Sequence, residues 1–331
     1  MRIIRSILIA SMLCSCWLAG GSDLRQIGMV NLPGAPGFGQ LAFADGMLLL
    51  THTAASSVDI FDPSRRRLIA QITGLQSPRA IVVHENAGRV YIADHGNNSI
   101  VVVKVDGWKV IDTIALSGSP DALLLDGSDG VYWTDAEAGT ISLLDLHTKQ
   151  DVARLNLNGT PRSLALDDAR NLVYVTLQDQ HQIVVLDPQL KVVNRYNLNA
   201  SQPTSLVYDP ENSELYVAVR SAVIGINANN GAEIDRVTAP AGVDALWLDG
   251  DSRTLYAASE GTLLVMSVKG KLALTDTINA EVKGHTVAYD ADKRMVLLPG
   301  GREGKSKLQI LRPMNINPQT GMADNTSAAV R

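Results

Sequence analysis

The sequence predicts an all-β protein, a seven-bladed β-propeller built from four-stranded blades, and three observations lead to this prediction. First, a short phrase, in its clearest copies Ser-Pro or Thr-Pro before an apolar run, recurs seven times at intervals of about 41 residues. Second, each copy is followed about ten residues later by an apolar strand that mostly contains tyrosine. Third, each repeat holds four strand segments, and four strands per 40-odd residues are typical of propeller blades.

Two features identify each repeat, a polar residue near the start of the recurring segment and the tyrosine strand that follows it. Neighbouring copies of the polar position lie 39 to 42 residues apart. The first and last repeats are weaker, because Leu48 and Leu297 replace the tyrosine. The polar positions are Gln40, Arg79, Asp121, Arg162, Thr204, Asp244 and His285, and the tyrosine strands begin at Val90, Val131, Val173, Leu215 and Leu255.

The fourth repeat illustrates the strands within one unit. Strands are expected at residues 163–166, 172–176, 182–186 and 191–198, which are rich in β-branched residues, leucine and tyrosine. An aspartate opens the turn after the first strand, and its side chain can bond the backbone of the hairpin that follows. We expect this structural role for Asp126, Asp167, Asp209, Asp249 and Asp290.

The two ends of the repeat array predict how the ring closes. The last unit has a third strand at residues 307–311 but lacks a fourth, whereas residues 25–32 form a strand without a blade of its own. If the N-terminal strand joins the last blade, residues 22–314 form one closed propeller and the termini are tied together. The polar tail at residues 315–331 is expected to be disordered.

Residues 1–21 predict a secretory signal. Arg2 and Arg5 precede an apolar stretch that is far shorter than the ~20 residues needed to span a bilayer. Cleavage near Gly20, lipidation of Cys16 and a retained signal anchor stay open, since Leu-Cys-Ser before Cys16 is similar to a bacterial lipoprotein box. For a cleaved or lipidated chain we expect an extracytoplasmic domain, in the periplasm or as an outer-membrane lipoprotein held to the membrane only through Cys16.

Composition narrows the classes of function. Hydrophobic residues make up 46% of the 331 residues, enough for a buried core, and the formal net charge of −5 gives no global attraction to nucleic acid. Cys14 and Cys16 are the only cysteines, which excludes a disulfide framework or a zinc–cysteine cluster in the body of the chain. We therefore expect a monomer that binds no nucleic acid.

The first strand of each propeller blade lines the central channel, so the seven polar positions should form a ring at one mouth of this channel. The hairpins after the second strands should lie beside this ring, and they carry His52, His95, Glu137, Arg220, Glu260 and Arg302. The candidate ligand-binding residues are Gln40, Arg79, Asp121, Arg162, Thr204, Asp244, His285, His52 and His95. One alternative stays open, since these charges could simply pair with one another around channel water.

Several hypotheses for the function use this ring. It could bind a protein partner or a small anionic ligand, because arginine forms charge-assisted bonds to carboxylate and phosphate. A lactonase-type hydrolase would use His285 as base and Asp244 to orient it, with Arg79 or Arg162 at the oxyanion. A non-covalent cofactor such as haem would use His285 or His52, and a scaffold would leave the channel inert. We favour binding over catalysis, and predict no cofactor and no metal, because two arginines without asparagine make a poor metal cage.

The tyrosine strands also give the sequence a family resemblance. The strands YIAD, YVTL, YVAV and YAAS, with the phrases before them and the turn aspartates, resemble the YVTN-type β-propeller repeats of bacterial secreted proteins, including YncE-like proteins. ADHGNNSI at Ala93 is similar to an NHL-repeat loop, and YWTD at Tyr132 to a receptor-propeller motif. The resemblance covers residues 23–314 and implies the propeller fold. It implies no activity, because such propellers share no catalytic set.

Overall fold

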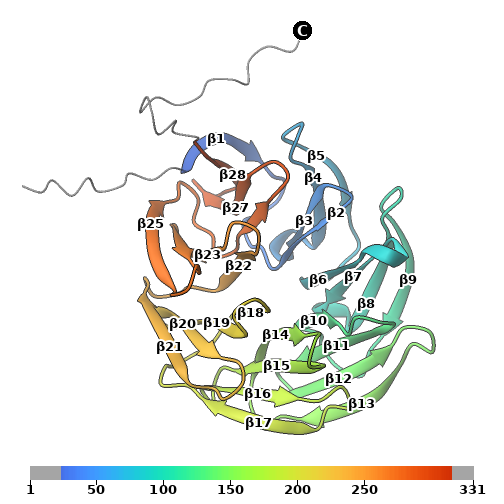
Figure 1. Cartoon of the computed structure of the whole chain (residues 1–331). Coiled ribbons are helices and arrows are strands. Elements are labelled where there is room, and N and C mark those ends of the chain that lie inside the picture. Colours follow the sequence, from blue (N-terminus) through green and yellow to red (C-terminus); the bar gives the residue numbers. More distant parts are fainter. Residues whose placement is uncertain (1–23, 315–331) are drawn as a thin grey trace, which may run out of the picture.

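The computed structural model describes residues 24–314, which form a ring of seven four-stranded antiparallel sheets (Figure 1). Each sheet is one blade, and the chain runs outward through one blade before it enters the next. The prediction of an all-β, seven-bladed propeller is therefore confirmed. The predicted signal at residues 1–21, with Cys16, and the predicted tail at residues 315–331 lie outside the described residues.

Six blades consist of four consecutive strands each. Blade 1 contains β2 (Leu41–Ala44), β3 (Met47–His52), β4 (Ser57–Asp62) and β5 (Arg67–Ile72), and blade 2 contains β6 (Pro78–His84), β7 (Arg89–Asp94), β8 (Ser99–Lys104) and β9 (Lys109–Ala115). Blade 3 contains β10 (Ala122–Leu125), β11 (Gly130–Asp135), β12 (Thr140–Asp145) and β13 (Gln150–Asn156), and blade 4 contains β14 (Pro161–Asp167), β15 (Leu172–Leu177), β16 (Gln182–Leu186) and β17 (Val192–Asn197). Blade 5 contains β18 (Leu206–Asp209), β19 (Glu214–Val219), β20 (Ala222–Asn227) and β21 (Glu233–Thr238), and blade 6 contains β22 (Ala245–Asp249), β23 (Thr254–Ser259), β24 (Thr262–Ser267) and β25 (Ala273–Asn279). Three short 3-10 turns, η1 (Thr53–Ala55), η2 (Glu85–Ala87) and η3 (His95–Asn97), lie in the hairpins of blades 1 and 2.

Blade 7 closes the ring with strands from both ends of the described chain. It contains β26 (Ala288–Asp290), β27 (Met295–Arg302) and β28 (Lys305–Pro313), and β1 (Leu24–Asn31) pairs antiparallel with β28 as its outermost strand. The predicted closure by the N-terminal strand is thus confirmed. Because β28 gains a ladder partner, the last blade has the same four strands as the other six.

The apolar core is divided into clusters that lie between neighbouring blades. Tyr174 of blade 4 belongs to the same cluster as Leu215 of blade 5, and Leu48 of blade 1 belongs to the same cluster as Ile310 of blade 7. Since each blade buries its faces against its two neighbours, a single blade would leave apolar surface in water. Closure of the ring therefore completes the core as well as the sheet.

The turn aspartates hold the hairpins at the end of the ring where the innermost strands finish. Four of them accept a hydrogen bond from a backbone N–H of the hairpin that they open, namely Asp126, Asp167, Asp209 and Asp290. Asp249 accepts instead from the Ser252 hydroxyl at 2.5 Å. The expected bond to the hairpin backbone is therefore confirmed for four of the five aspartates, and Asp249 holds its turn through a side chain instead.

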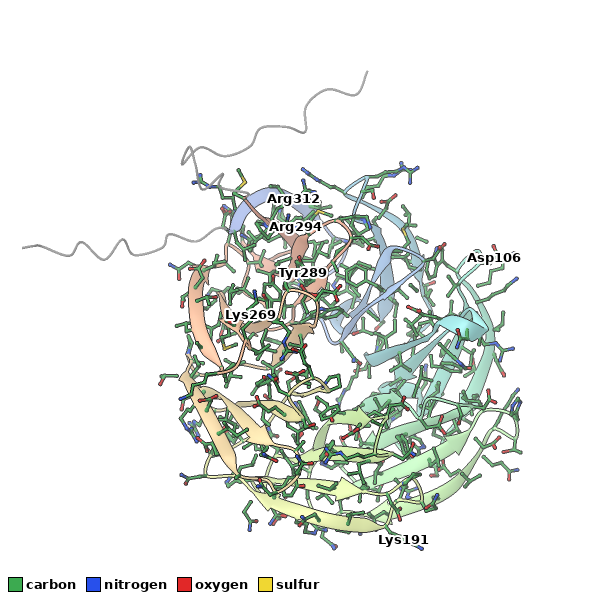
Figure 2. The ribbon with its side chains drawn as sticks, in the orientation of Figure 1. Asp106, Lys191, Lys269, Tyr289, Arg294 and Arg312 are labelled. Carbon is green, nitrogen blue, oxygen red and sulfur yellow. The ribbon has the colours of Figure 1, made fainter. Side chains whose placement is uncertain are left out.

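Blades 1 to 6 each carry a β-bulge at the same place, between the third and fourth strands. In five of them the extra residue is an exposed aliphatic one, with 40% to 60% of its surface in solvent: Ile69, Ile111, Val152, Val193 and Ile234. Charged side chains such as Asp106 and Lys191 extend from the circumference of the ring (Figure 2). Bulges and charges on outer strands hinder pairing with another molecule.

Candidate functional site

The innermost strands surround a channel with a volume of about 680 Å³. All seven polar positions that the repeat placed in a ring line this channel, and they lie where the innermost strands begin. They are Gln40, Arg79, Asp121, Arg162, Thr204, Asp244 and His285. We call this end of the channel the mouth.

The channel becomes apolar behind the mouth. The position after each polar residue is small or hydroxylated in most blades, for example Ala122, Ser163 and Ser205, and leucines follow, such as Leu123 and Leu164. A polar entrance before an apolar interior is the usual arrangement of a small-molecule site, in which a few polar groups fix orientation.

One side of the mouth is internally neutralised. Arg79 donates to one carboxylate oxygen of Asp121, and the backbone N–H of Ala136 donates to the other at 2.7 Å. His95 lies behind this pair, with its Nδ1 3.5 Å from Asp121 Oδ1 and without a hydrogen-bond partner among the described residues. For these residues the alternative that charges pair with one another agrees with the geometry.

Arg162 differs from Arg79. Its side chain is exposed and forms no hydrogen bond or ion pair with any residue from 24 to 314, and the same holds for Arg220 in the hairpin of blade 5. Beside Arg162, the Ser163 hydroxyl accepts the N–H of Leu206 at 3.1 Å. Its own proton has no acceptor within the described part of the chain. The mouth thus offers an unpaired guanidinium next to an available hydroxyl donor.

His285 and Asp244 lie on neighbouring blades, as the repeat predicted. The His285 Nε2 is 3.9 Å from Asp244 Oδ2, and the two side chains are 54% and 38% exposed. Two other members of the ring connect blades to each other. The Thr204 hydroxyl donates to the carbonyl of Val243 at 3.0 Å, and the Gln40 side-chain oxygen accepts the N–H of Ile81 at 3.1 Å.

His52 does not reach the mouth, which corrects its assignment as a ligand-binding residue. The side chain is completely buried, its Nδ1 is 2.8 Å from Asp59 Oδ2, and its Nε2 is 2.8 Å from the carbonyl of Ala35. The ring also stacks on Phe38. Since both nitrogens lie within hydrogen-bond distance of protein oxygens and the ring is completely buried, neither nitrogen is open to a haem iron. Its place at a strand end resembled that of a rim residue, but burial decides its role.

The remaining hairpin residues are distributed on the surface. Glu137, Arg220 and Glu260 are exposed, and Arg302 pairs with Glu281. Within residues 24–314 no cluster of three or more histidine, cysteine, aspartate or glutamate side chains has the arrangement of a metal site. Among the same residues, no helix has the length and apolar character needed to cross a bilayer.

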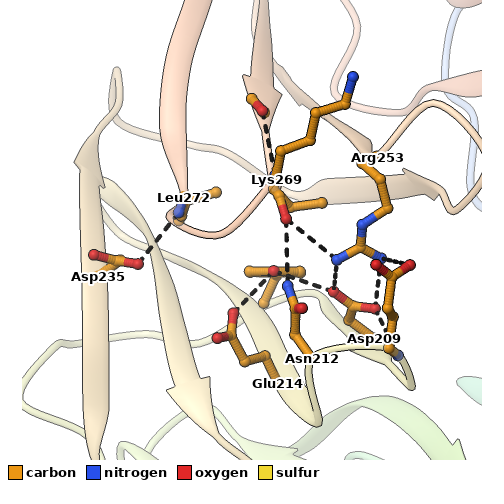
Figure 3. Close-up of polar contacts among 11 residues, drawn as sticks. Asp209, Asn212, Glu214, Asp235, Arg253, Lys269 and Leu272 are labelled. Atoms are coloured by element: carbon orange, nitrogen blue, oxygen red, sulfur yellow. Dashed lines mark hydrogen bonds and ion pairs between the residues drawn. The ribbon is translucent and has the colours of Figure 1, made fainter.

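Two carboxyl groups with shifted pKa values lie at the other end of the blades, in the contact between blades 5 and 6 (Figure 3). Burial alone would raise the pKa of Asp209, but the hydrogen bonds and charge of Arg253 outweigh it and hold that pKa below its usual range. Burial raises the pKa of Glu214, and the nearby Asp209 raises it further. These buried groups bind to each other, which identifies the cluster as structural.

The structure contains a second cavity, of about 460 Å³, that was not predicted from the sequence. It lies between blades 7 and 1 and shares Phe38, His285 and Thr286 with the channel mouth. The available signal was Pro299, which stands where the other repeats have threonine or alanine, and the two glycines that follow it.

The seven blades and the central channel define the class of protein as a β-propeller. No family model matches the chain. Antigen Lp49 of Leptospira interrogans serogroup Icterohaemorrhagiae serovar copenhageni (strain Fiocruz L1-130) is 19% identical over 194 residues, which cover 52% of this chain and 42% of that protein. The match therefore spans less than half of the relative's length.

Among solved structures, Kuenenia stuttgartiensis hydrazine synthase is similar to this chain with a TM-score of 0.73. The match covers 86% of this chain and 97% of the other at 13% sequence identity. At this level of identity the similarity supports the propeller fold alone, because propellers with unrelated activities share it.

Proposed function

We propose that this protein is a binding propeller that captures an anionic group, a carboxylate or a phosphate, at the channel mouth through Arg162. The unpaired, exposed guanidinium of Arg162 is the observation that carries the proposal. Arg79 occupies the equivalent position two blades earlier, but Asp121 already neutralises it. An anion that binds Arg162 has no internal carboxylate to displace.

The surroundings of Arg162 support the same ligand chemistry. The hydroxyls of Ser163 and Ser205 each accept a backbone N–H of the next blade, from Leu206 and Leu246, so the position of each oxygen is fixed while its proton can be donated. A guanidinium and preorganised hydroxyls suit the oxygens of a carboxylate or phosphate. The anionic group can belong to a small molecule or to an acidic side chain of a partner protein.

Calorimetric titration tests this proposal with acetate, inorganic phosphate and a poly-glutamate peptide as probes. A hydrogen bond to a charged group contributes about 1.5–3 kcal/mol, so Arg162→Ala should weaken binding roughly 10- to 100-fold. Arg195→Ala, at an exposed position on the outer strand β17, is the matched control and should bind like the wild type. Preference for the peptide over the small anions identifies a protein partner, and the reverse identifies a small ligand. Equal affinity of wild type and Arg162→Ala for every probe contradicts the proposal.

A second candidate function is hydrolysis of a lactone, and the pairing of His285 with Asp244 favours it. The 3.9 Å separation is longer than a hydrogen bond, but catalytic contacts often shorten when substrate binds. His285 would act as base and Asp244 would orient it. If the chain is such an enzyme, γ-butyrolactone hydrolysis above the buffer rate is lost in His285→Gln and reduced in Asp244→Asn. A wild-type rate equal to that of buffer refutes hydrolysis of this substrate.

We also propose that the propeller works outside the cytoplasm and belongs among the YVTN-type, YncE-like repeat proteins. The N-terminal residues support the location, and the spacing of the tyrosine strands supports the family. Native mass spectrometry of protein from the envelope of its own host tests the location. A chain that retains residues 1–21 without lipid and fractionates with the cytoplasm contradicts it.

A further inference from the structure

The cavity between blades 7 and 1, which we call the 7–1 cleft, interrupts the regularity of the ring. Its walls come from the segment before blade 1, from residues 283–286 at the start of blade 7, and from the hairpin between β27 and β28. The cleft adjoins the channel mouth, because Phe38, His285 and Thr286 line both spaces. A volume of about 460 Å³ is within the range of small-ligand sites.

Pro299 explains why the cleft forms at this blade. Pro299 is paired with an aliphatic residue of the third strand of its blade. By the same pairing, the equivalent residues of the other blades are Thr51, Ala93, Thr134, Thr176, Ala218 and Ala258. At this position Ala218 donates its N–H to the Ser205 carbonyl at 3.0 Å, and Ala258 is paired with Ala245 of the innermost strand. Proline has no N–H to donate, so the same bond cannot form in blade 7.

The ladder of blade 7 is therefore interrupted beside Pro299. Regular pairing of β26 begins only at Ala288, opposite Leu297. Further out, Lys283 and Gly301 exchange two backbone hydrogen bonds of 2.8 and 2.9 Å. The intervening segment, residues 284–287, has no regular partner strand, and the 7–1 cleft lies along it.

Glycines permit the close packing of the backbone at this interruption. A side chain on Gly284 would collide with the Pro299 carbonyl, and a Cβ on Gly300 would come within 2.7 Å of the Lys283 carbonyl. A Cβ on Gly301 would instead lie 3.2 Å from Pro36, across the cleft. A larger residue at Gly301 would therefore fill the cleft from the side.

The lining of the cleft combines an apolar wall with unpaired donors. Pro36, Phe38 and Pro299 provide the apolar wall. Thr286 is only 6% exposed, yet its hydroxyl forms no hydrogen bond with any residue of the described chain. Lys283 is exposed and has no ion-pair partner among the same residues. The oxygen of this hydroxyl keeps access to solvent, so a ligand in the cleft can accept its proton.

We propose that the 7–1 cleft is a second binding site, distinct from Arg162, for a small carboxylate with a flat apolar body. The apolar body packs on Phe38 and the two prolines, and the carboxylate accepts hydrogen bonds from Thr286 and Lys283. Glu303 lies at the edge of the same cleft and disfavours ligands that carry further negative charge. The site therefore prefers a monocarboxylate.

Phenylacetate, acetate and the neutral phenylacetamide are the probes that test this site by titration calorimetry. Phenylacetate should bind the wild type more tightly than either of the others, since only phenylacetate has both the aryl group and the carboxylate. Gly301→Val should weaken phenylacetate binding at least 10-fold. Gly250→Val is the matched control, because Gly250 has open space around it, far from the cleft in the turn between β22 and β23.

Thr286→Val keeps the shape of the side chain and removes its hydroxyl, so it tests the site even if Gly301→Val does not fold. It should reduce the preference for phenylacetate over phenylacetamide roughly 5- to 10-fold, because the lost hydrogen bond is stronger to a charged carboxylate than to a neutral amide. Because Arg162 can also bind the carboxylate of phenylacetate, the same titrations are repeated in the Arg162→Ala background. Phenylacetate binding that remains there and weakens on Thr286→Val belongs to the cleft, which separates this site from the proposed function. No measurable phenylacetate binding by the wild type, or a Thr286→Val variant that keeps wild-type preference, overturns the proposal.

Discussion

The contact between Arg253 and Asp209 offers a direct test of how the blades are held together (Figure 3). Arg253 lies in the turn between β22 and β23 of blade 6 and donates two hydrogen bonds, of 2.8 and 2.5 Å, to the carboxylate of Asp209 in blade 5. A third bond, of 3.2 Å, reaches the carbonyl of Val268. Arg253→Met removes the charge and these donors but keeps an unbranched apolar chain.

The expected loss of stability follows from burial. The Asp209 side chain is completely buried and that of Arg253 is 11% exposed, so the variant leaves a buried carboxylate without its cation. Removal of one partner of a buried pair typically costs 3–5 kcal/mol. Asp209 keeps the N–H of Glu211 as a donor at 3.1 Å, and the Tyr216 hydroxyl is shared between Asp209 at 3.3 Å and Glu214 at 2.9 Å. We therefore expect a loss of about 3 kcal/mol, at the lower end of that range.

Urea unfolding at neutral pH measures this loss. Arg236→Met is the matched control, because its partner Glu233 and Arg236 itself are both partly exposed and such pairs contribute under about 1 kcal/mol. Adding Asp209→Asn to Arg253→Met should recover much of the stability, since no buried charge remains. A loss below about 1 kcal/mol for Arg253→Met, or no recovery in the double variant, would refute this reasoning.

The pH dependence provides a second criterion for the same variant. In the wild type the pKa of Asp209 is lowered, so its contribution is present above the ordinary value of 3.8 and is lost as the pH falls through the folded-state pKa. Without Arg253, burial raises this pKa, and protonation relieves the buried charge. The difference in stability between variant and wild type should therefore shrink from about pH 7 to about pH 4.

Three further predictions concern other parts of the chain. Burial, and then the nearby Asp209, raise the pKa of Glu214, so the stability that its neutral form contributes is lost as the pH rises above 4.5. Glu214→Gln should therefore reduce the loss of stability between about pH 5 and about pH 8, as measured by urea unfolding. An unchanged pH dependence in this variant contradicts the prediction. Deletion of residues 24–31 removes the outermost strand of blade 7 and exposes the edge of β28. The variant should then associate through this edge, which light scattering detects. A monodisperse monomer with the wild-type melting temperature contradicts the closure argument. If Cys16 is lipidated, Cys16→Ser should abolish incorporation of labelled fatty acid and release the protein from the membrane fraction; equal labelling of both proteins contradicts lipidation at this residue.

The periodicity of the sequence was sufficient to predict the arrangement of the blades. A polar residue that recurs every 39 to 42 residues must occupy the same place in each blade, so the ring from Gln40 to His285 could be predicted without coordinates. The missing strand in the last unit and the unassigned strand at the N-terminus likewise fixed the closure. Both inferences need only the count of strands and the rule that sheet edges are covered.

Side-chain pairing could not be predicted in the same way. The repeat placed Arg79 and Arg162 in equivalent positions, yet the first is neutralised by Asp121 of the next blade and the second has no partner among the described residues. His52 ends a strand as a rim residue would, but the chain before blade 1 covers it and Ala35 occupies its Nε2. These differences depend on the loops between blades, which vary in sequence from repeat to repeat.

Blade 7 differs from the other blades at Pro299 in its second strand, and this difference bears directly on the proposed second site. In blades 5 and 6, the residue equivalent to Pro299 pairs with the innermost strand through its backbone, so its hydrogen-bonding groups are already used within the blade. A proline there has no N–H for these bonds, and the Thr286 hydroxyl beside it has no hydrogen-bond partner among residues 24–314. The interruption lies beside the cleft that we propose as a second binding site, and it is visible in the sequence as Leu-Pro-Gly-Gly in place of the tyrosine-strand pattern.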